Sequence, residues 1–129
     1  MSERPCPFCA PDPDRVFYRG QHVIALWDGF PVTDGHALLV PIRHVAGWLD
    51  ATEEERAELF QAIPLVMETI QEDWTPDGFN IGVNDGAAAG QTIDHLHLHV
   101  IPRYDGDVPD PRGGIRWVIP DRARYWDDE

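Results

Sequence analysis

Residues 94–101 constrain the fold more than any other segment, because histidine and apolar residues alternate along them in the order Asp-His-Leu-His-Leu-His-Val-Ile. In a β-strand, side chains two residues apart lie on the same face of the sheet. We therefore predict a strand over residues 94–101 that presents His95, His97 and His99 together. The opposite, core-facing row consists of the apolar residues between and after them, Leu96, Leu98 and Val100.

A solvated strand face is the simplest interpretation of these histidines, but half of the chain's six histidines lie within five residues. A metal site formed by all three is a second interpretation. Same-face residues lie about 6.6 Å apart, so three of them span about 13 Å, whereas a Zn–N bond is about 2.0 Å long. At most two could share one ion. Because imidazole has a pKa of about 6.5, it keeps a neutral nitrogen at neutral pH, and the row favours nucleophilic and acid–base catalysis.

Four further β-prone segments predict the rest of a sheet. Residues 16–18 and 22–27 flank a short glycine-containing turn and are typical of a hairpin. Residues 36–40 form a third run that ends at a proline, and residues 79–83 form a fourth. Together with the histidine segment, these runs predict about five strands.

One helix is expected after Thr52, because this threonine and the three glutamates that follow it match a capping box. Apolar residues then recur at helical spacing from Leu59 to Trp74. Pro64 falls inside this pattern, so the helix either kinks there or is divided into two shorter helices. The predicted fold is α+β, an antiparallel sheet of about five strands with one principal helix packed on it.

The chain is acidic, with a formal net charge of −13. This disfavours a general nucleic-acid-binding protein, which usually has a basic face. No run of about 18 apolar residues occurs, and residues 1–5 lack the apolar core of a signal peptide. We therefore expect a cytoplasmic protein without a membrane segment and a single domain over residues 1–129. Residues 108–129 are expected to form an irregular C-terminal tail that docks on another surface.

Cys6 and Cys9 are the only cysteines and have Cys-x-x-Cys spacing. In a reducing compartment such a pair is more often metal-binding or redox-active than a structural disulfide. A thioredoxin-like motif would follow a strand and begin a helix, whereas three prolines, Pro7, Pro11 and Pro13, crowd this segment. The pair could therefore supply two thiolates to a zinc ion.

The ordered motifs of the chain resemble the histidine triad (HIT) family. Its signature is His-φ-His-φ-His-φ-φ, where φ is apolar, and residues 95–101 match it. Residues 24–41 are similar to the family's strand, loop and Gly-His strand, and residues 41–44 match its Pro-x-x-His element. Asp34 is a departure, because the family usually has proline before the Gly-His pair.

The segments around the triad most resemble the fragile histidine triad branch, whose members are dinucleoside polyphosphate hydrolases. They are residues 85–92, which end in Gly-Gln-Thr, and residues 102–107. The resemblance covers roughly residues 6–107. It also implies a symmetric homodimer.

The resemblance assigns the catalytic roles to His97, His99 and Gln91. His97, the middle histidine, would attack the α-phosphate and form a nucleotidyl-histidine intermediate that water then cleaves. His99 would contact the α-phosphate oxygens, and Gln91 would offer donors to the phosphate and the leaving-group oxygen. Such chemistry depends on in-line positioning and on donors aimed at developing negative charge.

The resemblance also implies a nucleotide site. Asp28 would hold the ribose hydroxyls, because a carboxylate accepts two hydrogen bonds from a vicinal diol. An ordinary turn is the alternative for Asp28 and for the Gln91-Thr92 pair, and the core is the alternative for the apolar members. The full set is Asp28, Leu26, Leu38 and Phe8 for ribose and base, Asn84 at the rim, and Gln91, Thr92, His97 and His99 at the phosphate.

By the same resemblance, His44 and His95 would join the two cysteines, Cys6 and Cys9, as ligands of one zinc ion per chain. The first triad histidine would then face zinc and the second would face substrate. Four protein ligands leave no open coordination position, so this zinc would be structural.

The predicted reaction is hydrolysis of a dinucleoside polyphosphate or related nucleotide ester to a nucleoside monophosphate. Related nucleotidyltransferases carry glutamine at the position of His99, so this histidine favours hydrolysis over transfer. Nucleoside phosphoramidate hydrolysis would use the same residues. The chain could also be a nucleotide-binding sensor with incidental turnover, or could remove adenylate from nucleic-acid ends, which the acidic charge disfavours.

Overall fold

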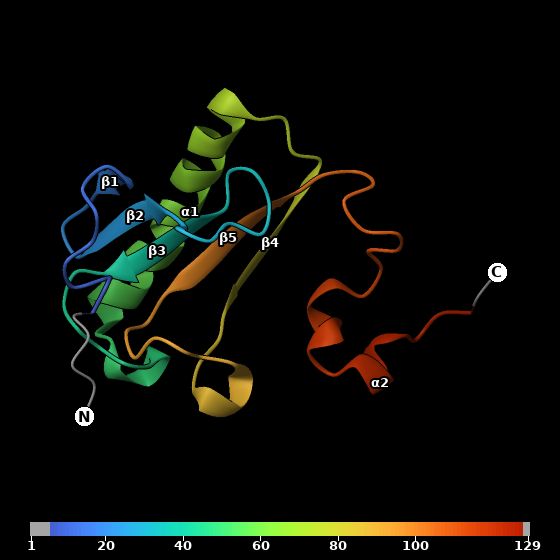
Figure 1. Ribbon diagram of the computed structural model, residues 1–129. Helices are drawn as coiled ribbons and strands as arrows, with labels where there is room; N and C mark the ends of the chain where they lie inside the picture. The colour runs from blue at the N-terminus through green and yellow to red at the C-terminus, as the bar shows by residue number, and fades with distance from the viewer. Residues whose placement is uncertain (1–5, 128–129) are drawn as a thin grey trace.

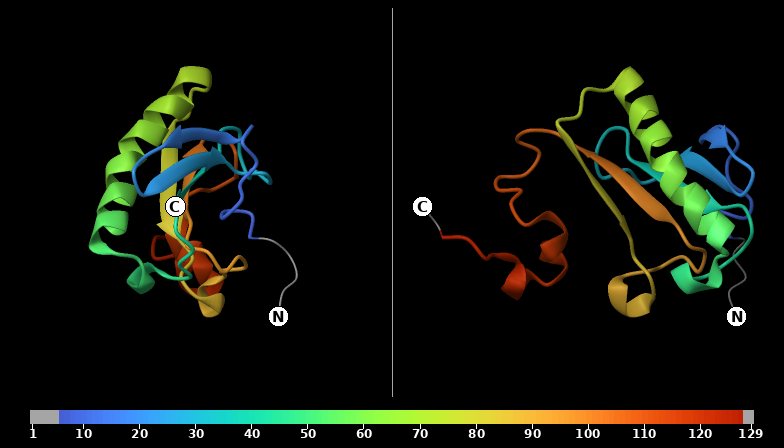
Figure 2. Two further views of the ribbon diagram at one scale, coloured as in Figure 1. Left: turned by 90° about the vertical axis from the view of Figure 1, so that its left-hand side faces the viewer. Right: turned by 180° about the vertical axis from the view of Figure 1, so that it is seen from behind.

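The computed structural model describes residues 6–127. Residues 1–5, from which we predicted the absence of a signal peptide, lie outside this part, as do residues 128–129. One antiparallel sheet has the order β1-β2-β3-β5-β4. The strands are β1 (Val16–Arg19), β2 (Val23–Trp27), β3 (Ala37–Pro41), β4 (Gly78–Val83) and β5 (Leu98–Arg103). A single long helix, α1 (Glu53–Asp73), covers one face of the sheet (Figures 1 and 2), which confirms the predicted architecture.

The start of α1 follows the predicted capping box. Thr52 is the N-cap, its hydroxyl accepts a hydrogen bond from the backbone N–H of Glu55 at 3.0 Å, and the Glu55 carboxylate accepts from the Thr52 N–H at 2.8 Å. The helix continues without a break through Pro64. The alternative of two shorter helices is therefore wrong, because packing of one continuous apolar stripe outweighs the single backbone hydrogen bond that proline cannot donate.

The sheet is buried on both of its faces near β2 and β3. Between the sheet and α1, the apolar row of β5 packs against the helix stripe that includes Leu59, Val66 and Ile70. The predicted core-facing row, Leu96, Leu98 and Val100, lies in this cluster. On the other face, a second cluster contains Phe8, Ile24, Leu26, Leu38 and Val40. Burial on both faces explains why β2 and β3 are continuous apolar runs.

The C-terminal segment extends beyond the β4 edge of the sheet (Figure 1). It contains two short helices that the sequence did not predict, η3 (Gly114–Val118) and α2 (Pro120–Ala123). Two further single-turn helices, η1 (Trp48–Asp50) and η2 (Ala87–Ala89), lie in loops. The Arg116 guanidinium ties η3 to α2 by donating to the carbonyl oxygens of Arg122 and Ala123 at 2.7 and 2.9 Å. Among residues 6–127, no helix combines the length and apolar character that a membrane crossing demands.

Candidate active site

The histidine segment differs from the predicted strand at its beginning. We predicted a strand over residues 94–101, but β5 begins at Leu98 and continues to Arg103. His95 and His97 therefore lie in the bend before the strand, and only His99 lies on it. The physical reason is that the backbone of this bend forms hydrogen bonds with a loop and not with a neighbouring strand. The Leu96 N–H donates to the Val45 carbonyl oxygen at 2.7 Å. The rings of His97 and His99 nevertheless stay adjacent, with centroids 5.1 Å apart.

The proton of neutral His97 has a defined position. Its Nδ1 lies 2.9 Å from the carbonyl oxygen of His95. A carbonyl oxygen can only accept a hydrogen bond, so Nδ1 carries the hydrogen and Nε2 keeps its lone pair. The His97 side chain is buried, with 7% of the residue exposed. The bend thus holds an imidazole whose Nε2 lone pair is available for nucleophilic or base chemistry.

His36, directly before β3, belongs to a second hydrogen-bonded group of side chains at the site. The backbone N–H of Val32 donates to His36 Nδ1 at 3.1 Å, so the hydrogen of neutral His36 lies on Nε2. This Nε2 lies 3.0 Å from His99 Nδ1 and 3.4 Å from a carboxylate oxygen of Asp28. His99 Nδ1 accordingly accepts, and its own hydrogen lies on Nε2. The backbone therefore sets His99 as a neutral N–H donor.

Burial lowers the pKa of both His36 and His99. The pKa of His99 falls to about 4, chiefly through desolvation and then through the nearby His97 and His36 rings, while the Asp28 carboxylate opposes the shift. Desolvation also lowers the pKa of His36, again against the attraction of Asp28. Both histidines are consequently neutral near pH 7. This protonation state agrees with the hydrogen bonds that connect them.

Asp28, His36 and His99 bring three potential ligand atoms within 4.8 Å of one another. A metal ion on His36 Nε2 would require the hydrogen of that ring to move to Nδ1. A hydrogen on His36 Nδ1 would face the N–H of Val32, which already donates to this nitrogen. The three side chains are therefore better described as a hydrogen-bonded relay.

The predicted ribose and base residues lie on the same face as His99. Leu26 pairs with Leu38 across β2 and β3, and Leu38 pairs with His99 across β3 and β5. Phe8 packs against His97 with ring centroids 5.0 Å apart. All three apolar residues are at most 5% exposed. Asp28 already uses one carboxylate oxygen, which accepts from the Phe30 N–H at 2.8 Å.

Gln91 and Thr92 lie in the loop before the triad, where the Gln91 side chain contacts backbone groups. The Gln91 amide donates to the carbonyl oxygens of Ala46 and Ile93 at 2.8 and 2.9 Å, and its oxygen accepts from the Gly86 N–H at 2.8 Å. The side chain thus fixes the loop before the triad. Gln91 and Thr92 line a separate cavity of about 280 Å³, and Asn84 instead lines a cavity that includes His99.

The structure brings Cys6, Cys9, His44 and His95 together, with their ligand atoms within 4.8 Å of one another. Cys9 Sγ lies 3.1 Å from His44 Nδ1 and 3.5 Å from His95 Nδ1, and Cys6 Sγ lies 3.3 Å from His95 Nδ1. Ligands of a tetrahedral zinc ion are roughly 3.3 to 3.8 Å apart, so the cluster fits such an ion. His95 Nε2 donates to the Pro41 carbonyl at 2.8 Å, which leaves Nδ1 free to bind metal.

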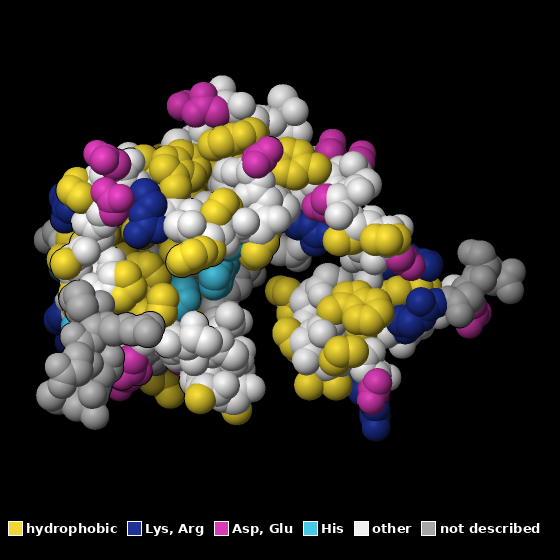
Figure 3. All heavy atoms as spheres, viewed as in Figure 1, with side chains coloured by type: hydrophobic (Ala, Val, Ile, Leu, Met, Phe, Trp, Pro, Cys, Tyr) yellow, Lys and Arg dark blue, Asp and Glu magenta, His cyan; other side chains and the backbone are white. Residues whose placement is uncertain are grey.

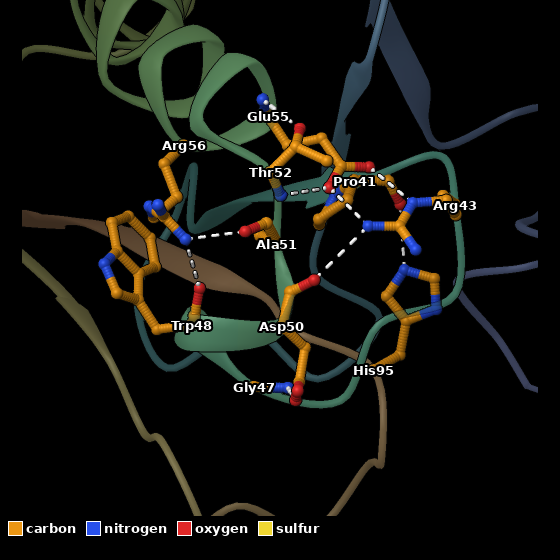
Figure 4. Close-up of polar contacts among 10 residues, drawn as sticks. All are labelled: Pro41, Arg43, Gly47, Trp48, Asp50, Ala51, Thr52, Glu55, Arg56 and His95. Atoms are coloured by element: carbon orange, nitrogen blue, oxygen red, sulfur yellow. Dashed lines mark hydrogen bonds and ion pairs between the residues drawn. The ribbon is translucent and has the colours of Figure 1, made fainter.

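The loop that carries His44 is fixed to the start of α1 (Figure 4). Arg43 donates to both carboxylate oxygens of Glu55 at 2.9 and 3.1 Å, and these hydrogen bonds hold the pKa of that buried carboxyl below its usual value. Arg56 donates to the carbonyl oxygens of Trp48 and Ala51. The helix cap thus also positions the loop that carries His44.

A domain model described as "HIT domain" matches residues 10–106, and the chain belongs to the HIT family. The expected family is confirmed. "Protein hit" of Bacillus subtilis is 38% identical over 103 residues, which cover 77% of this chain and 71% of that protein. A bis(5′-adenosyl)-triphosphatase of Saccharomyces cerevisiae is 34% identical over 116 residues, covering 88% of this chain but only 53% of the yeast protein.

A solved structure described as a Zn-bound histidine triad family protein from Mycobacterium smegmatis has a similar fold, with a TM-score of 0.72. It is 34% identical, and the match covers 81% of this chain and 84% of that chain.

Sequence reasoning missed His36 and the contribution of the C-terminal segment. The Gly-His pair at residues 35–36 was a signal for His36, but periodicity alone assigned it only to the start of a strand. Ile115 and Val118 of η3 line the cavity beside His99. The sequence analysis expected residues 108–129 to dock on another surface, but the sequence did not indicate that this surface would lie beside His99.

Proposed function

We propose that this protein hydrolyses nucleotides at the α-phosphate and releases a nucleoside monophosphate, with His97 as the nucleophile. The observation that carries the proposal is the hydrogen bond from His97 Nδ1 to the His95 carbonyl oxygen, because it leaves the Nε2 lone pair free. His99, with its hydrogen on Nε2, lies next to this ring. A nucleophile beside a fixed N–H donor is suited to attack on phosphorus with developing negative charge on its oxygens.

In the first step, His97 Nε2 forms a bond to phosphorus while the bond from phosphorus to the leaving group breaks. The leaving atom takes a proton from solvent, while the neutral His99 keeps its Nε2 hydrogen and donates a hydrogen bond with it. In the second step, a water oxygen attacks phosphorus and the N–P bond breaks. The proton that this water loses goes to solvent and balances the one taken in the first step, and nucleoside monophosphate leaves. Each histidine returns to its starting state, so the atoms and protons balance.

The remaining predicted residues receive supporting roles in this proposal. Asp28 holds the ribose, and Phe8, Leu26 and Leu38 contact the base after the Phe8 ring moves aside from His97. Asn84 contacts substrate at the cavity beside His99. Gln91 acts through the loop that it fixes, unless it exchanges a backbone partner for a phosphate oxygen. Thr92, whose hydroxyl has no partner within residues 6–127, is free to donate to phosphate.

Two classes of leaving group are supported by different observations. The similarity to a bis(5′-adenosyl)-triphosphatase favours dinucleoside polyphosphates. The cavity beside His99 has no acidic or basic side chain in its described lining apart from the two relay histidines, which favours nucleoside phosphoramidates with an uncharged leaving group.

We also propose that zinc occupies the Cys6, Cys9, His44 and His95 cluster, where it joins the N-terminal segment to the bend that carries the triad. When bound, it would serve as a structural cross-link. A homodimer is proposed as well, since β4 is an edge strand with one side unpaired in the described sheet. The molar mass in solution tests the dimer.

The test of the proposed function is product analysis across a panel of dinucleoside polyphosphates, phosphoramidates and nucleotide sugars. We expect a nucleoside monophosphate from at least one of them, at about 1 s⁻¹ or faster. Tight nucleotide binding with no turnover on the panel would contradict the proposal and favour a nucleotide sensor.

A further inference from the structure

The loop between β2 and β3 carries Asp28 at its start and His36 at its end, so it holds two members of the relay. Figure 3, drawn from the same side as Figure 1, shows histidine side chains at the surface next to this loop. The loop tip, residues 29–35, has little apolar packing, because Phe30 and Val32 are 91% and 68% exposed. Burial contributes little at these two residues, so the position of the tip depends on hydrogen bonds.

Two hydroxyl groups join the loop tip to the end of β5. Thr33 Oγ1 donates to the Pro102 carbonyl oxygen at 2.7 Å, and the Tyr104 hydroxyl donates to the Asp34 carbonyl oxygen at 2.6 Å. In the described part of the chain, the loop tip forms no other hydrogen bond with residues outside the loop. One bond from each side therefore attaches the tip to the strand that carries His99, or to the residue directly after it.

The position of Tyr104 is itself fixed by a turn. Its backbone N–H donates to the Asp107 carboxylate at 3.0 Å, and the same carboxylate accepts two hydrogen bonds from Arg103 at 2.8 Å each. Partial burial, and then the nearby carboxylates of Asp34 and Asp77, raise the pKa of Tyr104. The Tyr104 hydroxyl therefore keeps its proton at neutral pH and donates from a fixed place.

The loop tip in turn places the backbone N–H of Val32. This group donates to His36 Nδ1 at 3.1 Å, which leaves the His36 hydrogen on Nε2, 3.0 Å from His99 Nδ1. Thr33 and Asp34, the two residues bonded at the end of β5, directly follow Val32. A shift of the tip by about 1 Å would lengthen the Val32 hydrogen bond beyond the usual limit of about 3.2 Å. The direction of the relay thus depends on how the tip is anchored.

We propose that Tyr104 and Thr33 are positioning residues, which hold the loop tip so that His99 keeps its hydrogen on Nε2 and donates it to the substrate phosphate. The phosphate contact rests on the proposed function, whereas the place of the hydrogen is a property of the free protein. Neither hydroxyl bonds to a histidine, so each acts through the loop backbone. Without either bond the Val32 N–H moves away from His36, and the relay adopts both hydrogen directions.

The first measurement uses ¹⁵N NMR of histidine-labelled protein without nucleotide, because the shift of a ring nitrogen depends on whether it carries hydrogen. In wild type, His99 Nδ1 should give the signal of a bare nitrogen and Nε2 that of a nitrogen with hydrogen. Tyr104→Phe and Thr33→Val should each move the two signals toward one another. Thr33→Ser keeps the hydroxyl and should keep the wild-type pattern. A purely structural role would leave this pattern unchanged in every variant.

The second measurement is steady-state kinetics on the nucleotide that wild type cleaves best. Tyr104→Phe and Thr33→Val should each lower kcat about threefold to tenfold, the effect of one lost hydrogen bond, while KM changes less. Thr33→Ser should stay near the wild-type kcat. When His36→Phe is already present, adding Tyr104→Phe should lower kcat by less than about twofold, because the relay through which Tyr104 acts is gone.

Tyr18→Phe and Thr69→Val are the matched controls, because each makes the same substitution away from the loop. Tyr18 lies on β1 and packs against the core. Thr69 lies on α1, where its hydroxyl donates to the Leu65 carbonyl oxygen at 2.9 Å. Both variants should keep the wild-type kcat and the wild-type ¹⁵N pattern of His99.

Several outcomes would overturn the positioning role. An unchanged ¹⁵N pattern in both Tyr104→Phe and Thr33→Val would do so, and so would a changed pattern with unchanged kcat. A loss of kcat that is the same with and without His36, or that also appears in the two controls, would show that Tyr104 acts by another route. A wild type that cleaves no nucleotide of the panel would overturn the proposed function, while the ¹⁵N signals would still decide whether the loop tip sets the hydrogen of His99.

Discussion

His36 donates its Nε2 hydrogen to Nδ1 of His99 over 3.0 Å, and the backbone N–H of Val32 determines this direction by donating to the other nitrogen of His36. One main-chain group in the loop before β3 therefore decides which nitrogen of His99 faces a substrate as a donor. An opposite direction would place the hydrogen of His99 on Nδ1 and leave Nε2 as an acceptor, which repels a phosphate oxygen. The relay gives His36 a positioning role.

Replacing His36 by phenylalanine keeps a buried ring but removes both nitrogens. We expect kcat to fall about tenfold to a hundredfold while KM changes less, because His99 loses its orientation and not its presence. The pH profile provides a readout that a packing defect would not move. Without the neighbouring His36 ring, the pKa of His99 should rise from about 4, and the acid limb of kcat/KM should shift to higher pH. An unchanged acid limb would contradict the positioning role.

His97 should carry the covalent intermediate. His97→Asn should lower kcat at least about a thousandfold and leave nucleotide affinity nearly unchanged, because the lost bond forms only during reaction. Acid-labile, base-stable nucleotide should remain on wild-type protein after reaction with a slow substrate, and peptide mapping should find it on His97. His99→Asn is the comparison and should weaken both binding and turnover. Label on His99, or near-normal activity of His97→Asn, would show that the nucleophile is another residue.

The low pKa of His99 has a consequence for stability. Its folded-state pKa is about 4, below the value of about 6.5 expected in the unfolded chain. Between these values the unfolded state binds more protons, so this contribution to stability is present above about pH 6.5 and is lost as the pH falls toward 4. Thermal unfolding at about pH 7 and pH 5 should therefore show a smaller acid-induced loss in His99→Asn than in wild type. Equal losses would contradict the assigned pKa.

The sequence predicted those features that local pattern determines. The capping box at Thr52 and the apolar stripe beyond it defined α1, and alternation identified the core-facing row of Leu96, Leu98 and Val100. It did not predict where β5 begins. Within the bend, the His97 side chain forms a hydrogen bond with the His95 carbonyl oxygen. The alternation of apolar and polar residues does not predict such a bond.

Only those parts of the candidate site that belong to recognisable sequence motifs could be predicted. The cysteine and histidine cluster followed from family resemblance, because its members are separated by up to 89 residues and spacing alone does not join them. The tie of Gln91 to the backbone of Ala46 was not predictable, since a turn motif does not specify which oxygen an amide contacts. Ile115 and Val118 reach the site only through the path of the C-terminal segment.

Gly35 should be intolerant of a side chain. Its φ of +89° lies in the region that favours glycine, and a Cβ there would lie 2.9 Å from the Trp74 ring and 3.2 Å from Ile70. We expect Gly35→Ala to lower the free energy of unfolding by about 1 to 3 kcal/mol, measured by urea denaturation. Gly78→Ala is the control, because its Cβ meets nothing within 4 Å. Equal stability of the two variants would contradict the crowding described at Gly35.

The proposed zinc site gives a prediction that separates a structural role from a catalytic one. Purified protein should contain about one zinc per chain, and Cys6→Ser should lower both the metal content and the melting temperature, because ligand binding is coupled to folding. Cys6 and Cys9 belong to the segment that places Phe8 against His97. Loss of the metal should therefore loosen that segment and raise KM for nucleotide, while His97→Asn should leave both zinc content and melting temperature near the wild-type values. Protein that is purified without metal, and whose melting temperature does not change after chelation, would show that these four residues do not form a structural zinc site.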